Sequence, residues 1–409
     1  MHLIQRLAAQ YAFRPEWSEK KMIFLAGPRQ VGKTHLAKQE LKKQDCLELY
    51  LNFDLPEVTE KFRQDPQFFE SMARNLPHQR PTLVFDEIHK RSKWKNELKA
   101  IYDRDIQYFN LIITGSARLD LLGRTGESLA GRYFLYRVLP IGLQEYLGKI
   151  SLNPPPSQLS EIIALLTSKA SFPKEMADLL QLGGFPDPLS RGELTYRNKW
   201  AMDYRRLILR EDLRDLSRIM EIDRVETLWR LLPDRVGAPL SVKSLQEDLK
   251  ASHEAVSTWL LNLEKLYSIY SVQPYSKKLA RAVKKEKKYY LMDWALIQDE
   301  AKQFENFIMS SLVRSTSTWT DLGLGPFEVC YARNVLSQEA DFLITKEGKP
   351  WILGDIKLSQ TSIEKHLYQM SNQLGGIPIL QITKKTGIFQ TPHSNTLVIS
   401  ADRLLSLFP

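Results

Sequence analysis

Short continuous apolar runs recur along the first third of the chain, within residues 22–26, 82–87 and 111–116. Runs of this length without polar alternation are typical of strands buried on both faces, as in a parallel sheet. The segment from Lys33 to Lys43, directly after the first run, is predicted to be a helix. We therefore predict an α/β domain with a parallel sheet over residues 1–150, ending with a helix at 141–147.

The pattern changes after the consecutive prolines at 154–156, which mark a loop because proline cannot continue a helix. We predict a purely helical region at 151–221, a module of two helices and a hairpin at 222–295, and a second α/β domain at 296–409. The elements expected in these parts are helices at 160–220, 241–250, 253–266 and near 304–308, and strands at 267–272, 288–292, 339–345 and 351–358.

Residues 27–34, Gly-Pro-Arg-Gln-Val-Gly-Lys-Thr, match the pattern G-x-x-x-x-G-K-[ST] between the first predicted strand and helix. Glycines let the backbone turn its N–H groups toward a phosphate, and the helix N-terminus adds positive potential. Lys33 would neutralise the β- and γ-phosphates of ATP, and the Thr34 hydroxyl would hold Mg²⁺. The alternative is a glycine turn that carries a lysine by chance. The predicted nucleotide-binding residues are Gly27, Pro28, Arg29, Gln30, Val31, Gly32, Lys33, Thr34 and His35.

Two carboxylates end the second apolar run. Asp86 would bind Mg²⁺, partly through water, and Glu87 would act as the base that polarises the attacking water. A site that only binds phosphate needs the first acid alone, so the second one indicates ATP hydrolysis. A strand that ends in two surface acids is the alternative, which the complete phosphate loop upstream makes the weaker interpretation.

The third run ends in Thr114 and Ser116, either of which could sense the γ-phosphate from a neighbouring strand. Arg118 and Arg132 follow. Each could supply the guanidinium that stabilises the leaving charge, within one chain or from a neighbouring subunit of a homo-oligomer, or could be an ordinary surface arginine.

Composition fits a multidomain globular protein, with 43% hydrophobic and 26% charged residues among 409. No apolar run is long enough to span a bilayer, and the first residues lack the apolar core and cleavage site of a signal peptide. The two cysteines, Cys46 and Cys330, are far apart in apolar surroundings, as expected of buried thiols in a reducing compartment. We therefore expect a cytoplasmic protein without a membrane segment or a zinc site.

The net charge of +9 favours a polyanionic partner, and seven basic residues are concentrated in one segment with a single acid. Helix, turn, helix and basic hairpin is the layout of a winged helix, whose wing lysines would contact DNA phosphates. The alternative is a packing module with solvated lysines, because the second helix carries few base-reading side chains. The basic residues are Lys277, Lys278, Arg281, Lys284, Lys285, Lys287 and Lys288.

The strands at 339–345 and 351–358 are joined by a glycine-centred linker, which predicts a hairpin. A three-residue loop at 347–349 would set Asp341 opposite Asp355 and Glu339 opposite Lys357. Two facing carboxylates destabilise a sheet unless a cation such as Mg²⁺ or Mn²⁺ lies between them. With Lys357 on the same strand face as Asp355, this is the arrangement of a metal-dependent phosphodiesterase.

Glu305, on the predicted helix near 304–308, would complete the metal ligands if that helix packs behind the hairpin. The alternative is a sheet face with a Glu339–Lys357 ion pair and an exposed pair of acids, because the spacing D-x₁₃-D-x-K is common by chance.

The chain resembles the prokaryotic AAA-type P-loop ATPases that carry a winged helix and a C-terminal restriction-endonuclease-like domain. The resemblance implies an ATPase at 1–150, a helical lid at 151–221, a winged helix at 222–295 and a nuclease-like α/β domain at 296–409. Asp355 stands where that family more often has glutamate. The matching segments are residues 27–34, 85–90, 114–116, 128–132, 183–186, 289–293, 304–306, 339–341 and 355–357.

Two functions follow from these observations. In the first, a Mg²⁺-dependent ATPase acts on DNA and repositions a nuclease domain that cuts with Mg²⁺ or Mn²⁺. In the second, the C-terminal domain does not cleave, and the protein is a nucleotide-switched DNA-binding or scaffold ATPase.

Overall fold

The computed structural model describes residues 4–74, 76, 80–115, 129–216, 221–276 and 286–409. The chain divides into two compact units. One unit consists of residues 6–139 with 265–267, and the other of residues 1–5, 140–264 and 268–409. Among the described helices, none combines the length and the apolar character that a membrane span requires.

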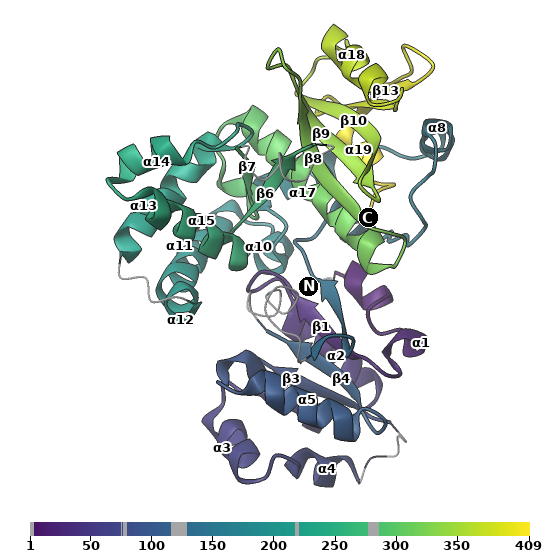
Figure 1. Ribbon diagram of the computed structural model, residues 1–409. Coiled ribbons are helices and arrows are strands. Elements are labelled where there is room, and N and C mark those ends of the chain that lie inside the picture. Colours follow the sequence, from purple (N-terminus) through teal and green to yellow (C-terminus); the bar gives the residue numbers. More distant parts are fainter. Residues whose placement is uncertain (1–3, 75, 77–79, 116–128, 217–220, 277–285) are drawn as a thin grey trace. The chain divides into compact units, whose positions relative to one another are not determined.

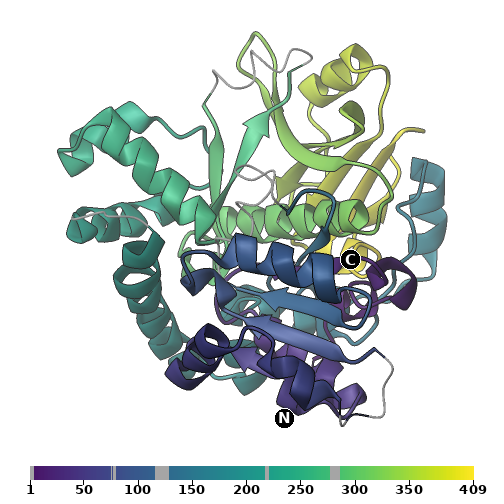
Figure 2. The ribbon, with the colours of Figure 1, turned by 60° about the horizontal axis from the view of Figure 1, so that its bottom comes forward.

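The first unit is built on a five-stranded parallel sheet with the strand order β2-β3-β4-β1-β5. Every residue of β1 and β3 is buried, as continuous apolar runs predict for a parallel sheet covered on both faces. Helices lie on both sides of this sheet (Figure 2). Its strands are β1 (Met22–Ala26), β2 (Tyr50–Asn52), β3 (Thr82–Asp86), β4 (Asn110–Thr114) and β5 (Tyr133–Arg137).

Three of these elements carry the predicted chemistry. The strand predicted at 22–26 and the helix predicted at 33–43 are confirmed with the same bounds, as β1 and α2 (Lys33–Lys43). Strand β3 ends at Asp86, so both acids come at the carboxyl end of the sheet, beside the start of α2. The remaining helices of this unit are α1 (Pro15–Ser18), α3 (Pro56–Gln64), α4 (Phe68–Ala73) and α5 (Trp94–Asp105), with 3₁₀ turns η1 (Leu7–Gln10), η2 (Leu47–Leu49) and η3 (Ile88–Lys90).

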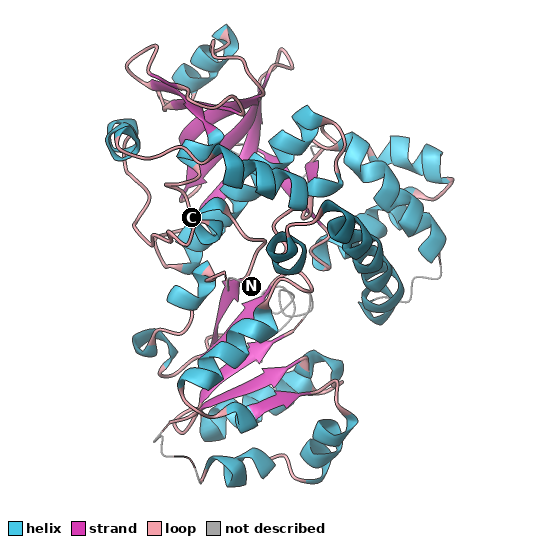
Figure 3. Ribbon diagram, turned by 180° about the vertical axis from the view of Figure 1, so that it is seen from behind, coloured by secondary structure: helices cyan, strands magenta, loops and turns pink. Residues whose placement is uncertain are grey.

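The second unit begins with a run of helices. The helix predicted at 141–147 is the shorter α7 (Leu143–Tyr146), and all described elements from it to α15 are helical, as predicted (Figures 1 and 3). These elements are α8 (Leu159–Thr167), α9 (Pro173–Leu182), α10 (Pro186–Arg191), α11 (Leu194–Leu207), the π-helix η5 (Ile208–Asp212), α12 (Leu213–Leu216), α13 (Ile222–Leu231), η6 (Leu232–Arg235), α14 (Val242–Leu249) and α15 (His253–Lys265).

An eight-stranded mixed sheet follows, with the order β12-β13-β11-β10-β9-β8-β6-β7. The predicted hairpin of the middle module is present as β6 and β7. Strand β6 also pairs in parallel with β8 through Gln273 and Pro274, so the hairpin is the edge of the C-terminal sheet. The strands are β6 (Ile269–Pro274), β7 (Lys288–Leu291), β8 (Phe327–Arg333), β9 (Glu339–Lys346), β10 (Lys349–Lys357), β11 (Ile379–Thr383), β12 (Phe389–Gln390) and β13 (Thr396–Ser400).

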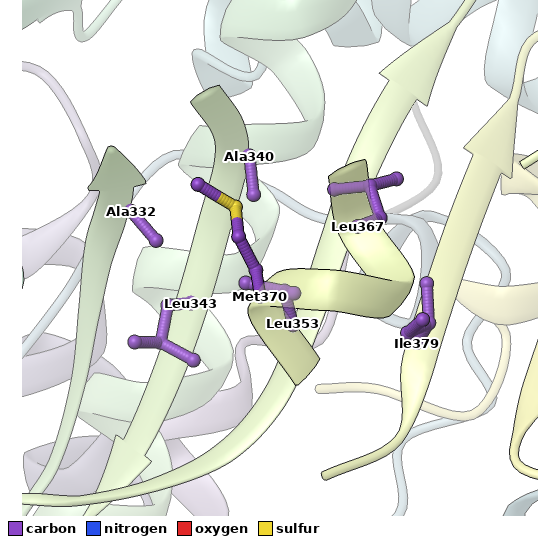
Figure 4. Packing of buried hydrophobic residues seen from close by; sticks show 7 residues of the cluster. All are labelled: Ala332, Ala340, Leu343, Leu353, Leu367, Met370 and Ile379. Carbon is purple, nitrogen blue, oxygen red and sulfur yellow. The ribbon is translucent and has the colours of Figure 1, made fainter. Parts of the chain in front are cut away.

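Three helices accompany this sheet: α17 (Glu300–Asp321), α18 (Lys365–Gln373) and α19 (Ala401–Leu404), with the short η7 (Trp294–Leu296) before them. Leu367 and Met370 of α18 pack on small and branched side chains of four neighbouring strands, which fixes the strands that carry the predicted acids (Figure 4). The strand residues of this core are Ala332, Ala340, Leu343, Leu353 and Ile379.

The β9–β10 hairpin corrects the predicted loop and confirms its register. Lys346 pairs with Lys349, so the loop has two residues, Glu347 and Gly348, both with positive φ (53° and 72°) as a type I′ turn requires. A register shift between Pro350 and Ile352 then places one extra residue on β10. This extra residue compensates for the loop being one residue shorter than predicted. Beyond the shift Gly354 pairs with Phe342, which sets Asp355 opposite Asp341 as predicted.

Candidate functional site

The loop between β1 and α2 curls over the carboxyl end of the first sheet. Gly27 has φ 151°, and a Cβ there would lie 2.1 Å from the Val138 carbonyl oxygen, so only glycine fits against β5. Gly32, with φ 103°, caps the start of α2. Lys33 Nζ donates to the carbonyl oxygens of Gly27 (2.9 Å) and Pro28 (2.6 Å). The ammonium therefore lies within the loop that would hold phosphate.

Asp86 accepts hydrogen bonds from three hydroxyl groups. Thr34 Oγ1 donates to Asp86 Oδ2 at 3.0 Å, and the Tyr50 and Thr114 hydroxyls donate to the same carboxylate. Burial and the bond to Asp86 raise the pKa of Tyr50. A carboxylate beside the first hydroxyl of α2 is a donor set that suits Mg²⁺, which prefers oxygen ligands. Thr34 and Asp86 are the residues that would hold that ion.

Glu87 follows in a left-handed conformation (φ 58°), and its N–H donates to the Thr114 carbonyl oxygen at 3.1 Å. Burial, and next the charge of Asp86, raise the pKa of Glu87 to about 7, whereas Lys33 opposes the shift. His89 Nδ1 lies 3.3 Å from Glu87 Oε2. A carboxyl group that titrates near neutral pH is suited to accept a proton from water.

Lys33, Thr34 and Glu87 border a pocket of about 460 Å³. Six of the nine predicted residues at 27–35 line it. Gly27 and Pro28 do not, and Val31 is buried, with its carbonyl oxygen accepting from Arg6. Lys38 was not predicted, although its position one turn after Thr34 on α2 indicates the same helix face. The lining residues are Arg29, Gln30, Gly32, Lys33, Thr34, His35, Lys38 and Glu87.

Arg132 does not lie at this pocket. Its carbonyl oxygen accepts from Met22 N at 2.9 Å, at the amino end of the parallel strands, and its Nε donates to Asp103 at 3.0 Å. The five-residue strand β1 runs from Met22 to the phosphate loop, about 16 Å at the rise of a strand. The prediction that Arg132 contacts the nucleotide of its own chain is therefore wrong, and a contact from a neighbouring subunit stays a prediction. Ser116 and Arg118 lie outside the described residues.

The second unit brings four acids together, which we call the carboxylate cluster: Glu305 of α17, Glu339 and Asp341 of β9, and Asp355 of β10. Asp341 N donates to Asp355 Oδ1 at 3.2 Å, and Ile356 N donates to Asp341 Oδ2 at 2.8 Å. Burial, and next the charges of Asp355 and Glu305, raise the pKa of Asp341 to about 7. The three acids predicted as metal ligands thus occupy one site.

Two lysines balance the charge of this cluster. Lys357 Nζ lies 3.0 Å from Asp355 Oδ2 and 3.6 Å from Glu364 Oε1, so the predicted Glu339–Lys357 alternative pair is wrong. Glu339 instead pairs with Lys288, at 3.1 Å between Nζ and Oε1. The predicted wing role of Lys288 is also wrong, because its side chain is 1% exposed.

Sequence reasoning missed Tyr290 and Lys288 as part of this cluster. The Tyr290 hydroxyl donates to Glu305 Oε1 at 2.8 Å, while burial raises the pKa of Glu305. Within the described residues, no three His, Cys, Asp or Glu side chains are arranged to hold a metal ion. Because ammonium groups already contact the acids, the cluster as it stands does not fit a divalent cation.

Comparison with known proteins identifies the first unit. Residues 19–147 match the family model described as an AAA domain, which spans the phosphate loop, Asp86 and Glu87. This part of the chain is an AAA domain with the P-loop of a nucleotide-binding ATPase. Residues 173–305 match a domain of unknown function, DUF8612.

The chain is similar over most of its length to proteins of distant organisms. An uncharacterized protein of Methanocaldococcus jannaschii is 23% identical over 85% of this chain and 77% of its own length. An uncharacterized protein of Mycobacterium tuberculosis is 22% identical over 99% of this chain and 85% of its own length. Among solved structures, the Aeropyrum pernix Orc1 protein in complex with DNA aligns with a TM-score of 0.30 and 16% identity, over 74% of this chain and 88% of that one. That alignment is too loose to support an inference.

Proposed function

We propose that the protein is a Mg²⁺-dependent ATPase that acts on DNA. The observation that carries the proposal is the pocket of the AAA domain, where Lys33, Thr34 and Glu87 face one cavity beside Asp86. Lysine and loop amides bind phosphate, and a carboxylate with a pKa near 7 accepts a proton from water. Mg²⁺, when bound, would neutralise charge on the β- and γ-phosphates.

The residues of the chain then divide the work of hydrolysis. Lys33, which now donates to the carbonyl oxygens of Gly27 and Pro28, would bind the phosphates. Thr34 and Asp86, which hydrogen-bond to each other, would hold the ion. Glu87, held by the Thr114 carbonyl oxygen at its backbone, orients the attacking water and takes its proton.

The pKa of Glu87 predicts the pH dependence of ATP hydrolysis. A base is active when unprotonated, so kcat/KM, which reports the free enzyme, should rise about tenfold per pH unit below pH 7 and level off above it. Initial rates from pH 5.5 to 8.5 check this, with ATP affinity measured at both ends as the control. A flat profile across pH 7 would contradict a base that titrates near 7.

DNA binding is supported by the net charge of +9 and by the module between residues 222 and 295. Helices α13, α14 and α15 precede the β6–β7 hairpin, and Pro239 forms an isolated bridge with Lys288. This order of helices and hairpin supports a winged helix as the DNA-binding module. Five of its seven predicted wing residues, Lys277, Lys278, Arg281, Lys284 and Lys285, lie outside the described residues.

We expect Gln at Lys277, Lys278, Lys284 and Lys285 to weaken duplex DNA binding equally for all sequences. Fewer phosphates would be neutralised. The slope of log Kd against log salt should therefore decrease by up to about four, one for each lysine removed. The control carries Gln at four exposed lysines elsewhere: Lys42, Lys43, Lys93 and Lys99. Fluorescence anisotropy at several salt concentrations measures both quantities, and ATP turnover with and without duplex DNA tests whether DNA acts on the ATPase. Unchanged affinity and slope would refute the wing.

A second function, a nucleotide-switched DNA-binding ATPase whose C-terminal domain does not cleave, is favoured by one observation. In the proposed nuclease-like domain, the buried Lys288 ammonium contacts Glu339, and its charge also acts on Glu305 and Asp341, two of the acids that a cleavage reaction would need for metal.

A further inference from the structure

A lysine side chain is buried within the carboxylate cluster. Lys288 exposes 1% of its surface, and lysine is almost never fully buried unless it is paired. Its Nζ lies 3.1 Å from Glu339 Oε1 and 5.2 Å from the centroid of the Tyr331 ring. Its charge also lowers the pKa of Glu305 and Asp341 against the stronger effect of burial. The Lys288 ammonium therefore interacts favourably with three of the four acids: Glu339, Glu305 and Asp341.

The backbone holds this ammonium in place from two sides. Lys288 begins β7, where it pairs with Val272 of β6, and it also bridges to Pro239. The Lys287 carbonyl oxygen accepts from Leu240 N at 2.8 Å. The backbone that carries this side chain is therefore fixed beside the cluster by pairing on both sides.

We propose that Lys288 is the built-in cation of the carboxylate cluster and that it closes this cluster to divalent metal. Opposed carboxylates attract a cation because their mutual repulsion is relieved by it. The ammonium of Lys288 supplies that charge from within the chain, as Lys357 does for Asp355. A dication would have to share the site with a fixed positive charge a few ångströms away, which strongly opposes its binding.

The inference rests on the proposed nuclease-like domain only for the identity of the acids. Metal binding is measured without DNA and without cleavage, so the absence of nuclease activity and the failure of this inference give different results.

Lys288→Met removes the charge and keeps most of the side-chain volume, so it should create a metal site. The probe is Mn²⁺ alone, counted by the loss of the free-ion signal in electron paramagnetic resonance, with full-length protein and no nucleotide. We expect Lys288→Met to bind one more Mn²⁺ per chain than wild type, at least about tenfold more tightly than any binding that wild type shows at the cluster. The extra site should vanish in Lys288→Met/Asp341→Asn.

Lys287→Met is the matched control, because it makes the same change of net charge at the adjacent residue, whose side chain is half-buried and has no ion pair among the described residues. Mn²⁺ bound at the phosphate loop should be the same in all variants and therefore cancels when they are compared. Equal binding by wild type and Lys288→Met would overturn the inference. If Lys288→Met does not fold, Mn²⁺ binding by wild type and by Asp341→Asn still tests the inference. Equal Mn²⁺ binding by these two supports a closed cluster, and a site present in wild type but lost in Asp341→Asn overturns it.

Discussion

Lys33→Ala protein should lose ATP binding, whereas Glu87→Gln protein should bind ATP and scarcely hydrolyse it. Lys33 is the ammonium inside the phosphate loop, and charge-assisted hydrogen bonds contribute about 1.5 to 3 kcal/mol each, so affinity should fall by about a hundredfold or more. Glu87 acts on the attacking water, and loss of a general base costs about 10² to 10⁴ in kcat. The two variants therefore separate binding from chemistry.

Isothermal titration with ATP and a steady-state phosphate-release assay measure the two effects. Lys43→Ala is the matched control, since Lys43 lies on the same helix and pairs with Glu40 at an exposed position. Lys33→Ala with wild-type affinity would refute the phosphate-loop assignment. Glu87→Gln with wild-type turnover would leave the loop intact but exclude the proposed base.

Asp341→Asn should raise the melting temperature at pH 8 in chelator. Asp341 has an ordinary pKa of 3.8 that the folded protein raises to about 7, so the native state binds more protons than the unfolded state between these values. Stability conferred by this group is therefore present at low pH and lost as the pH rises from about 4 to 7. At 1.36 kcal/mol per pKa unit the cost at pH 8 is about 2 to 4 kcal/mol, which the neutral amide avoids.

Asn still offers an oxygen to Ile356 N, so the backbone contact is retained. The melting temperature should rise by about 5 °C or more at pH 8 and change little at pH 4, where both side chains are neutral. Glu328→Gln is the control, because Glu328 is an exposed acid on the neighbouring strand β8. A variant that melts below wild type at pH 8 would contradict the prediction.

Cleavage is tested with wild type and two further variants of the cluster. We expect no nicking of supercoiled plasmid by wild type in Mg²⁺ or Mn²⁺. Nicking that Asp355→Asn and Lys357→Ala abolish, with ATP hydrolysis unchanged, would instead establish the nuclease and refute the second function.

The local pattern of the chain was sufficient to predict the strand, loop and helix at residues 22–43. A continuous apolar run, a glycine loop and a helix are contiguous in sequence, so β1, α2 and their contacts follow from short-range rules. Tyr50 could not be found in this way, because β2 has three residues and no periodicity identifies so short a strand. Arg132 was placed wrongly because its distance from the loop depends on the direction in which β5 runs beside β1.

The carboxylate cluster depended on long-range contacts that the local pattern of the chain does not determine. The facing pair Asp341 and Asp355 was predicted through a loop one residue too long, and the register shift near Trp351 compensated for that error. Lys288 was assigned to a DNA-contacting wing, or alternatively to a solvated face, because charge runs usually lie at the surface. Only the pairing of β6 with β8, residues far apart in sequence, brings it beside Glu339.

The pairing of β6 with β8 bears on how this protein can be divided and how it can evolve. A fragment that begins at residue 296 would lack the two outer strands, leaving β8 as a bare edge open to association and Glu339 without its lysine. Recombination that exchanged the C-terminal segment between distant relatives would break the same sheet. The β6–β7 hairpin and the C-terminal strands are therefore expected to be inherited together.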